Sequence, residues 1–241
     1  MPEESSRGLT GFLSRLGSRK SLESPDPTAA APADFGPLEP QPPIQPTKAL
    51  RKFLSMLSTR ESPVLLDLGP VIGPNLNFFG ETLGCKVFIE DLFADLERHL
   101  RAGSIAEFPA FLKKRLTQPA GSVDGILAWD LIDYLDLPAA QALAGELARL
   151  MRVDAALLGF FNAAPPRGRE QTQHYTKYIV VDEQSLRHRW YPASRGRQRV
   201  LQNRDIIKLF EGLRVSDSFL LQTNVREILF RRPGYLSQAV P

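Results

Sequence analysis

One stretch of the chain predicts a buried strand followed by a tight turn: Val64-Leu65-Leu66-Asp67-Leu68-Gly69-Pro70-Val71-Ile72-Gly73. A short run of branched aliphatic residues ends at Asp67, and two glycines follow at spacings that suit a turn from a strand into a helix. In open α/β sheets such a turn lets the backbone and a helix N-terminus approach a small ligand at the carboxyl end of a strand. The stretch therefore predicts a site for a nucleoside-like cofactor.

Composition is that of an ordinary globular protein. The 241 residues are 43% hydrophobic and 24% charged, which suffices for one domain with a sizeable core, and the net charge of +3 neither demands nor excludes an anionic partner. Cys85 is the single cysteine, so no internal disulfide forms, and its place at the start of a predicted strand favours a buried structural thiol. No apolar run approaches the roughly 20 residues that span a bilayer. The first residues are polar and acidic, unlike a signal peptide, so we expect a cytoplasmic protein without a transmembrane segment.

Proline-rich composition sets the first 47 residues apart from the rest. Eight prolines lie between Pro25 and Pro46 among small and polar residues, a composition that cannot bury enough apolar surface to fold. We therefore expect a disordered tail over residues 1–47 and a folded domain over 48–241. Near the start of the tail, four apolar residues fall on one helical face beside basic residues, which suits either a peptide that folds on a partner or an anionic membrane, or a plain disordered terminus. These four are Leu9, Phe12, Leu13 and Leu16.

Strands and helices alternate from Lys48 onward. This order predicts a mostly parallel sheet that is covered on both faces and ends in an antiparallel pair. Strands are expected at 64–69, 86–90, 123–129, 155–161, 215–221 and 226–231, and helices at 49–59, 74–83, 92–102, 107–116, 138–151 and 203–212.

This order resembles that of the class I S-adenosylmethionine-dependent methyltransferases over residues 48–233. The turn from Asp67 to Gly73 is similar to the family's acidic-x-Gly-x-Gly-x-Gly turn, which wraps the methionine moiety of the cofactor. Glu90, followed by Asp91, stands at the end of the second strand, where the family places an acid on the ribose hydroxyls. Residues 124–135 are similar to the family's fourth strand and the loop after it, and residues 143–161 to the helix and fifth strand that follow.

The resemblance implies a three-layer, Rossmann-like α/β sandwich with a mostly parallel seven-stranded sheet and a C-terminal antiparallel hairpin. It implies S-adenosylmethionine as cofactor and methyl transfer to an acceptor that the sequence does not identify. Enzymes of this kind act mainly by positioning the acceptor, so no catalytic residue is named. The implied cofactor-binding residues are Asp67, Gly69, Gly73, Glu90, Asp91 and Asp130.

Other interpretations of the two strand-end acids stay open. A carboxylate at a strand end can accept two hydrogen bonds from a vicinal diol, which suits Glu90 to ribose, but a solvated charge is the alternative. Asp67 could instead cap the next helix or hold the loop.

The glycine-rich turn is degenerate, because Val71 replaces the middle glycine between Pro70 and Pro74. A valine with negative φ that packs beneath the turn would leave the pocket open, whereas one that projects between Asp67 and Glu90 would exclude methionine. In the second case the protein would be a non-catalytic binding or scaffold module of the same fold. The connection from Glu90 to Asp124 also shows no clear third strand with an acidic end. The sequence 129–132 reads Trp-Asp-Leu-Ile where methyltransferases of nucleic acid bases have Asn-Pro-Pro-Tyr, which disfavours that activity.

The remaining polar motifs are less specific. The three histidines, of which one is His174, have no metal-ligand spacing among themselves or with the cysteine, so no metal site is expected. His174 or Tyr175 could act as a base toward an acceptor, or be a surface polar residue. The basic segment from Arg187 to Arg204, with Trp190 and Tyr191, suits an anionic ligand or RNA, or a solvated loop.

Overall fold

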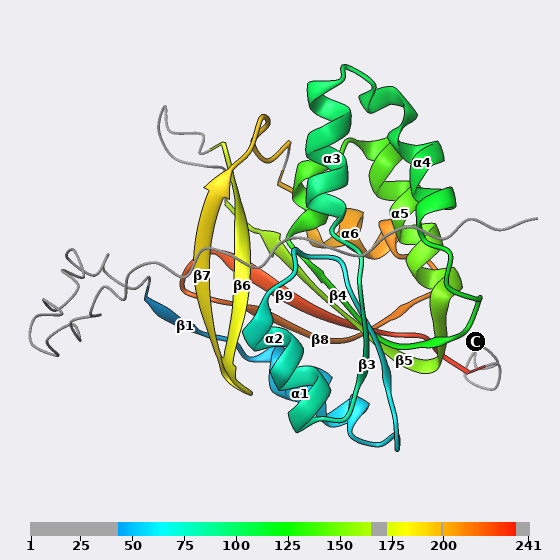
Figure 1. The fold of residues 1–241 in the computed structure, drawn as a ribbon, viewed down its shortest axis with the longest axis vertical. Coiled ribbons are helices and arrows are strands. Elements are labelled where there is room, and N and C mark those ends of the chain that lie inside the picture. The colour runs from blue at the N-terminus through cyan, green and yellow to red at the C-terminus, as the bar shows by residue number, and fades with distance from the viewer. Residues whose placement is uncertain (1–42, 165–172, 199, 235–241) are drawn as a thin grey trace, which may run out of the picture. The chain divides into compact units, whose positions relative to one another are not determined.

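The main sheet has the strand order β3-β2-β4-β5-β9-β8 in a computed structural model that describes residues 43–164, 173–198 and 200–234 (Figure 1). The first four strands of this order are parallel; β9 is antiparallel to β5, and β8 is antiparallel to β9. A mostly parallel sheet with a C-terminal antiparallel hairpin is thereby confirmed. In order of position the strands are β3 (Lys86–Ile89), β2 (Val64–Asp67), β4 (Val123–Trp129), β5 (Met151–Asn162), β9 (Val225–Arg231) and β8 (Arg214–Leu220).

The expected count of seven strands is corrected to six among the described residues. The chain between β3 and β4 forms helices rather than a further strand at the edge, as the lack of a strand pattern there suggested. These are α3 (Leu92–Arg101), a 3₁₀ turn (Ile105–Glu107) and α4 (Phe108–Arg115).

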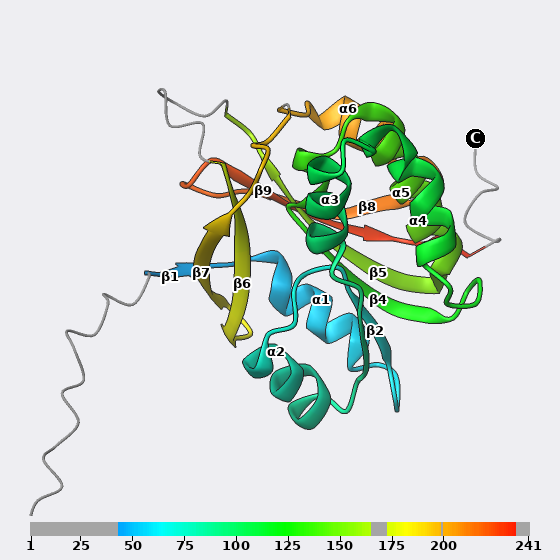
Figure 2. The same cartoon turned by 45° about the horizontal axis from the view of Figure 1, so that its top comes forward.

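Helices cover both faces of the main sheet, which gives three layers (Figure 2). On one face lie α1 (Ala49–Leu57) and α2 (Gly73–Asn77), the latter extended by a π-helical turn (Phe78–Thr82). On the other face lie α3 and α4 together with α5 (Leu137–Leu150) and α6 (Asn203–Leu209). In the part of the chain that the structure describes, no helix combines the length and hydropathy of a bilayer-spanning segment.

The connections that leave β2 and β4 run to opposite faces of the sheet. The chain leaves β2 through α2 on the first face, whereas it leaves β4 through a 3₁₀ turn (Leu131–Tyr134) and α5 on the second face. Because β2 and β4 are hydrogen-bonded neighbours, the carboxyl ends of these two strands form a topological switch point. A crevice at such a point is where open α/β sheets bind their ligands.

A second, three-stranded sheet forms from the segment after β5 and from residues near the start of the domain. It has the order β1-β7-β6, with β1 (Ile44–Pro46), β6 (His174–Asp182) and β7 (Ser185–Pro192), and we call it the cap sheet. In both views its β6–β7 hairpin stands across one end of the main sheet (Figures 1 and 2).

Strand β1 corrects the expected domain boundary at Lys48. Ile44–Pro46 pairs with β7, and the backbone N–H of Thr47 donates to the carbonyl of Gln184 at 2.8 Å. The other predictions for the tail fall on residues 1–42, outside the described residues.

Glu227 on β9 anchors the N-terminus of α1. Its buried Oε2 accepts hydrogen bonds from the backbone N–H groups of Lys48 and Ala49, each at 2.8 Å. No side chain caps this helix from its own N-cap position. A carboxylate at this end also meets the positive end of the helix dipole, so Glu227 joins the first helix to the last strand.

We expect Glu227→Ala to lower the free energy of unfolding by about 1.5–3 kcal/mol, because two backbone donors lose a charged acceptor. Glu227→Gln keeps one acceptor oxygen and should cost less. Urea denaturation of the three proteins measures both changes. Equal stability of the alanine variant and the wild type would show that water replaces the carboxylate at this helix end.

Candidate functional site

The six residues assigned to the cofactor lie at the carboxyl ends of three neighbouring parallel strands, β3, β2 and β4, or just beyond them. Asp67 is the last residue of β2, Glu90 and Asp91 follow β3, and Asp130 follows β4. Gly69 lies in the turn after β2, and Gly73 is the first residue of α2. The structure thus places all six at the carboxyl end of the sheet, but the carboxylates among them already form hydrogen bonds or ion pairs with other residues of the protein.

Asp67 holds the turn and a neighbouring tryptophan. Its buried Oδ1 accepts hydrogen bonds from the backbone N–H of Gly69 at 2.8 Å and from Nε1 of Trp129 at 2.6 Å. Burial raises the pKa of Asp67 to about 6, although the two hydrogen bonds act in the opposite direction. The alternative that Asp67 caps α2 is wrong, since no side chain caps that helix. Asp67 is instead the residue that holds the loop.

Trp129 is the site residue that the sequence analysis missed. Its indole is buried and stacks on Tyr178 of the cap sheet, with ring centroids 5.0 Å apart and an interplanar angle of 5°. It also lies against the turn, because a Cβ built on Gly69 would be 2.9 Å from Trp129 Nε1. The indole therefore lies between the end of β4 and the turn that follows β2.

Glu90 is engaged on the side of the sheet that α4 covers. It forms an ion pair with Nη1 of Arg115, and its Oε1 accepts a hydrogen bond from Nε2 of Gln118 at 2.6 Å. The Glu90 side chain is 12% exposed, so the alternative of a solvated charge is wrong. Both carboxylate oxygens have partners, and Glu90 joins the end of β3 to the segment after α4.

Asp91 and Asp130 have different partners again. Oδ1 of Asp91 accepts from the backbone N–H of Ala94 at 3.0 Å and caps α3. Oδ2 of the buried Asp130 accepts from Nη2 of Arg197 at 2.9 Å, in the chain that follows the cap sheet. Asp130 therefore ties the loop after β4 to the chain that follows the cap sheet.

Asp133 completes the contact between the cap and the loop after β4. It is fully buried, and its Oδ2 accepts from the backbone N–H and the side-chain amide of Asn162 at 2.9 and 2.7 Å. Nε of Arg197 lies 3.9 Å from the same oxygen, and the backbone N–H of Gln198 donates to the Asp133 carbonyl at 2.7 Å. Burial raises the pKa of Asp133 to about 7.

The basic segment is not one continuous cationic surface. Arg197 is turned inward to two buried carboxyl groups, and residue 199 lies outside the described residues. Trp190 is 72% exposed, and its ring lies against that of His174 in a tilted contact with 5.2 Å between the ring centroids. This arrangement gives no support to an anionic ligand or RNA, which remains a sequence prediction.

The two side chains proposed as bases, His174 and Tyr175, contact other residues of the protein. Tyr175 is buried, and its hydroxyl donates to Glu97 at 3.1 Å, so it is not a surface residue. Burial, followed by the charge of Glu97, raises the pKa of Tyr175 well above its usual value. Burial lowers the pKa of His174, which favours its neutral form. The prediction that Cys85 is a buried thiol is confirmed, and burial raises its pKa to about 11.

The turn accommodates Val71 without requiring glycine. Among the described non-glycine residues, those with positive φ are Trp129, Asp154 and Asn224, so Val71 lies outside the left-handed region. Its side chain is 65% exposed rather than packed beneath the turn. Asn75 then fixes the cap over this turn: its Nδ2 donates to the carbonyl of Tyr178, and its Oδ1 accepts from the N–H of Val180, both at 2.8 Å.

In this arrangement the residues at the switch point do not fit S-adenosylmethionine. The oxygens of Glu90 that would receive ribose hydroxyls already have partners, and the close approach at Gly69 is made by the indole of Trp129. Cofactor binding therefore requires a change in these contacts.

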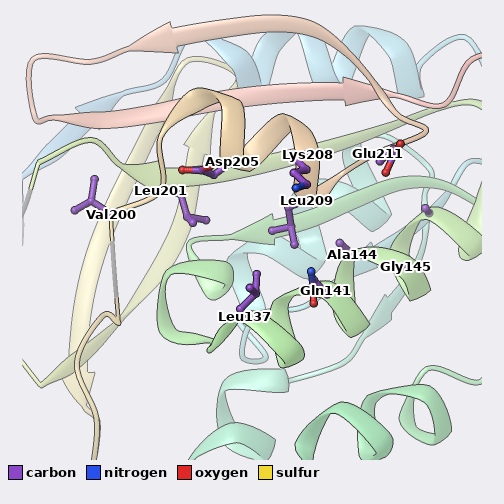
Figure 3. Close-up of a pocket in the computed structure, with 11 residues that line it drawn as sticks. Leu137, Gln141, Ala144, Gly145, Val200, Leu201, Asp205, Lys208, Leu209 and Glu211 are labelled. Carbon is purple, nitrogen blue, oxygen red and sulfur yellow. The ribbon is translucent and has the colours of Figure 1, made fainter.

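A separate cavity of about 590 Å³ lies between α5 and α6 (Figure 3). Leu137, Leu201 and Leu209 give it apolar walls, and the charged residues Asp205 and Lys208 also line it. None of its lining residues belongs to the switch point.

No protein-family model matches the sequence, and no curated protein matches it. Among solved structures, the chain is similar to the 1,6-didemethyltoxoflavin-N1-methyltransferase of Burkholderia thailandensis, with 16% identity over 77% of this chain and 79% of that chain, at a TM-score of 0.43. A SAM-dependent methyltransferase from Aquifex aeolicus shows 14% identity over 76% and 89%, at a TM-score of 0.44. The glycopeptide N-methyltransferase MtfA shows 15% identity over 78% and 96%, at a TM-score of 0.41.

The two buried carboxyl groups predict a pH dependence of stability. Because the folded-state pKa values of Asp67 and Asp133 are raised from the usual 3.8, the folded protein binds these protons more tightly than the unfolded chain does. Their contribution to the free energy of unfolding is fully present below about pH 4 and is lost as the pH rises to about 7. Asp133→Asn should therefore make the decline over this range shallower.

Urea denaturation between about pH 4 and 8 measures this decline, with Asp182→Asn as a control at an exposed carboxyl. An identical decline in the wild type and in Asp133→Asn would contradict the raised pKa of Asp133.

Proposed function

We propose that the protein is an S-adenosylmethionine-dependent methyltransferase with a separate methyl acceptor. The observation that carries this proposal is the switch point between β2 and β4, where an acid-ended strand turns through Gly69 and Gly73 into α2. Such a crevice offers backbone N–H groups and strand-end carboxylates to one ligand. The resemblance in sequence supplies the identity of that ligand.

The cap sheet supports a reaction at this crevice rather than simple binding at a surface. Its β6 strand places Tyr175 and Tyr178 on opposite sides of the main sheet, each within one of the two buried clusters. A cover of this kind excludes water and holds an acceptor in a fixed orientation, which is the main contribution of the protein to a group transfer.

A non-catalytic binding or scaffold protein is the second candidate, and the contacts of Glu90 favour it. A carboxylate that is bound by Arg115 and Gln118 has become part of the protein's own framework. For the enzyme, we propose that Asp91 takes the ribose role instead, since its carboxylate has a second oxygen beside the one that caps α3.

Calorimetric titration with S-adenosylhomocysteine separates the two candidates. We expect binding to the wild type, and Asp91→Asn should weaken it by about 1.5–3 kcal/mol through loss of a charged acceptor, while asparagine still caps α3. Glu90→Gln is the matched control and should retain the wild-type affinity. Weakening by Glu90→Gln alone would return the ribose role to Glu90, and no binding to any of the three proteins would favour the scaffold.

Gly73 offers a second test, because the packing of the described residues does not require a glycine there. A Cβ built on Gly73 meets nothing within 4 Å, and the same holds for Gly145 in α5. Alanine at either position should preserve stability or raise it by up to about 1 kcal/mol, since alanine favours helix. We expect Gly73→Ala to weaken S-adenosylhomocysteine binding and Gly145→Ala to leave it unchanged. Wild-type affinity in both variants would argue against close approach of the cofactor at Gly73.

A further inference from the structure

Trp129 contacts two residues of the switch point, Asp67 and Gly69, which the sequence resemblance assigns to the cofactor. Its Nε1–H donates to Asp67 at 2.6 Å, and the same Asp67 oxygen accepts from the turn at Gly69. The indole also lies where a Cβ on Gly69 would clash with it. The acid and the glycine of the turn are thus both in contact with one side chain that comes from the neighbouring strand.

The backbone of Trp129 is in an unusual conformation for a large residue. Its φ is 48°, in the left-handed region that favours glycine, and the pairing of β4 with β5 shifts register between Leu127 and Trp129. A bulky residue stays in that region only where surrounding contacts hold it, and such residues concentrate at ligand sites and switch regions. The indole of Trp129 makes three such contacts, with Asp67, Tyr178 and Phe160.

The cap sheet supplies one of these contacts. Tyr178 covers the flat face of the indole at 5.0 Å, and the Asn75 amide holds the backbone of Tyr178 and Val180 to the turn. Phe160 of the main sheet meets the indole edge-on at 5.7 Å. Movement of the indole away from Asp67 therefore disturbs the stack with the cap as well.

We propose that the Trp129 indole is a displaceable plug at the switch point, which occupies Asp67 and the Gly69 turn until a nucleoside cofactor replaces it. This inference rests on the proposed function. Binding then has two parts: the indole leaves Asp67 and its stack on Tyr178, and the cofactor enters the crevice. Only molecules whose indole has left Asp67 can bind the cofactor, so the apparent affinity falls as the plugged fraction rises. Weaker contacts of the indole with Asp67 or Tyr178 should therefore strengthen binding.

Tryptophan fluorescence reports on the plug directly, because Trp129 and Trp190 are the two tryptophans of the chain. Trp190→Phe removes the exposed one and leaves Trp129 as the single reporter. S-adenosylhomocysteine should move the Trp129 emission to longer wavelength, since the indole passes from a buried stack toward water. In stopped-flow mixing, the observed rate should level off at high ligand concentration, at the rate of plug release.

Two variants weaken the plug at different contacts. Trp129→Phe keeps a ring but loses the N–H that binds Asp67, and Tyr178→Leu removes the stacked ring of the cap. Each should raise the affinity for S-adenosylhomocysteine about tenfold, the change that corresponds to a lost contact of about 1.4 kcal/mol. Phe230→Leu is the control, since Phe230 is a buried aromatic of β9 in a tilted contact with Phe210. It should leave the affinity unchanged.

The outcomes separate the plug from the proposed function. Binding to the wild type with unchanged Trp129 emission overturns the plug and leaves the methyltransferase proposal standing. Binding to Trp129→Phe or Tyr178→Leu without binding to the wild type supports the plug and favours the scaffold. No binding to any variant overturns the plug together with the proposed function, because removal of the indole contacts then fails to open the site.

Discussion

A single buried carboxylate, Asp67, joins the three parts of the site. It ends strand β2, which lies between β3 and β4, accepts a hydrogen bond from Gly69 in the turn that follows, and accepts another from the indole that extends from β4. Burial without partners would be costly for such a group, and its two donors are what keep it in place. The turn, the plug and, through the stack on Tyr178, the cap sheet all depend on this one side chain.

Two further buried acidic residues attach the cap sheet to the main sheet at a second place, the chain that follows β7. Asp130 and Asp133 lie in the loop after β4, and Arg197 reaches both of them from the chain after β7. Burial is the main cause that raises the pKa of Asp133 to about 7, and the nearby charge of Asp130 acts in the same direction. The cap is thus held at Asn75 by neutral hydrogen bonds and at Arg197 by charge, so the two attachments respond differently to pH and salt.

The sequence was sufficient to predict the main sheet, because buried parallel strands appear as continuous apolar runs such as 155–161. It was not sufficient for the cap hairpin, whose strands mix buried residues such as Tyr178 with exposed ones such as Trp190 and lack a glycine-based turn signal. The strand-end acids were placed correctly, but their partners were not. Arg115 is 25 residues from Glu90, and Trp129 is 62 residues from Asp67, so both contacts depend on tertiary packing that no local pattern encodes.

The two glycines of the turn, Gly69 and Gly73, differ in whether the packing of the protein requires them. Gly69 is needed by the protein itself, since a Cβ there would lie 2.9 Å from the indole of Trp129. Asp67 likewise has a structural task in the plugged arrangement, so neither residue separates an enzyme from a scaffold. At Val71 the backbone does not use positive φ, which explains why a valine is tolerated there. Gly73 differs from all of these, because open space surrounds the position of its missing side chain in the described structure. Internal packing therefore does not explain the glycine at this position, and it leaves room there for the close approach of the ligand that we propose.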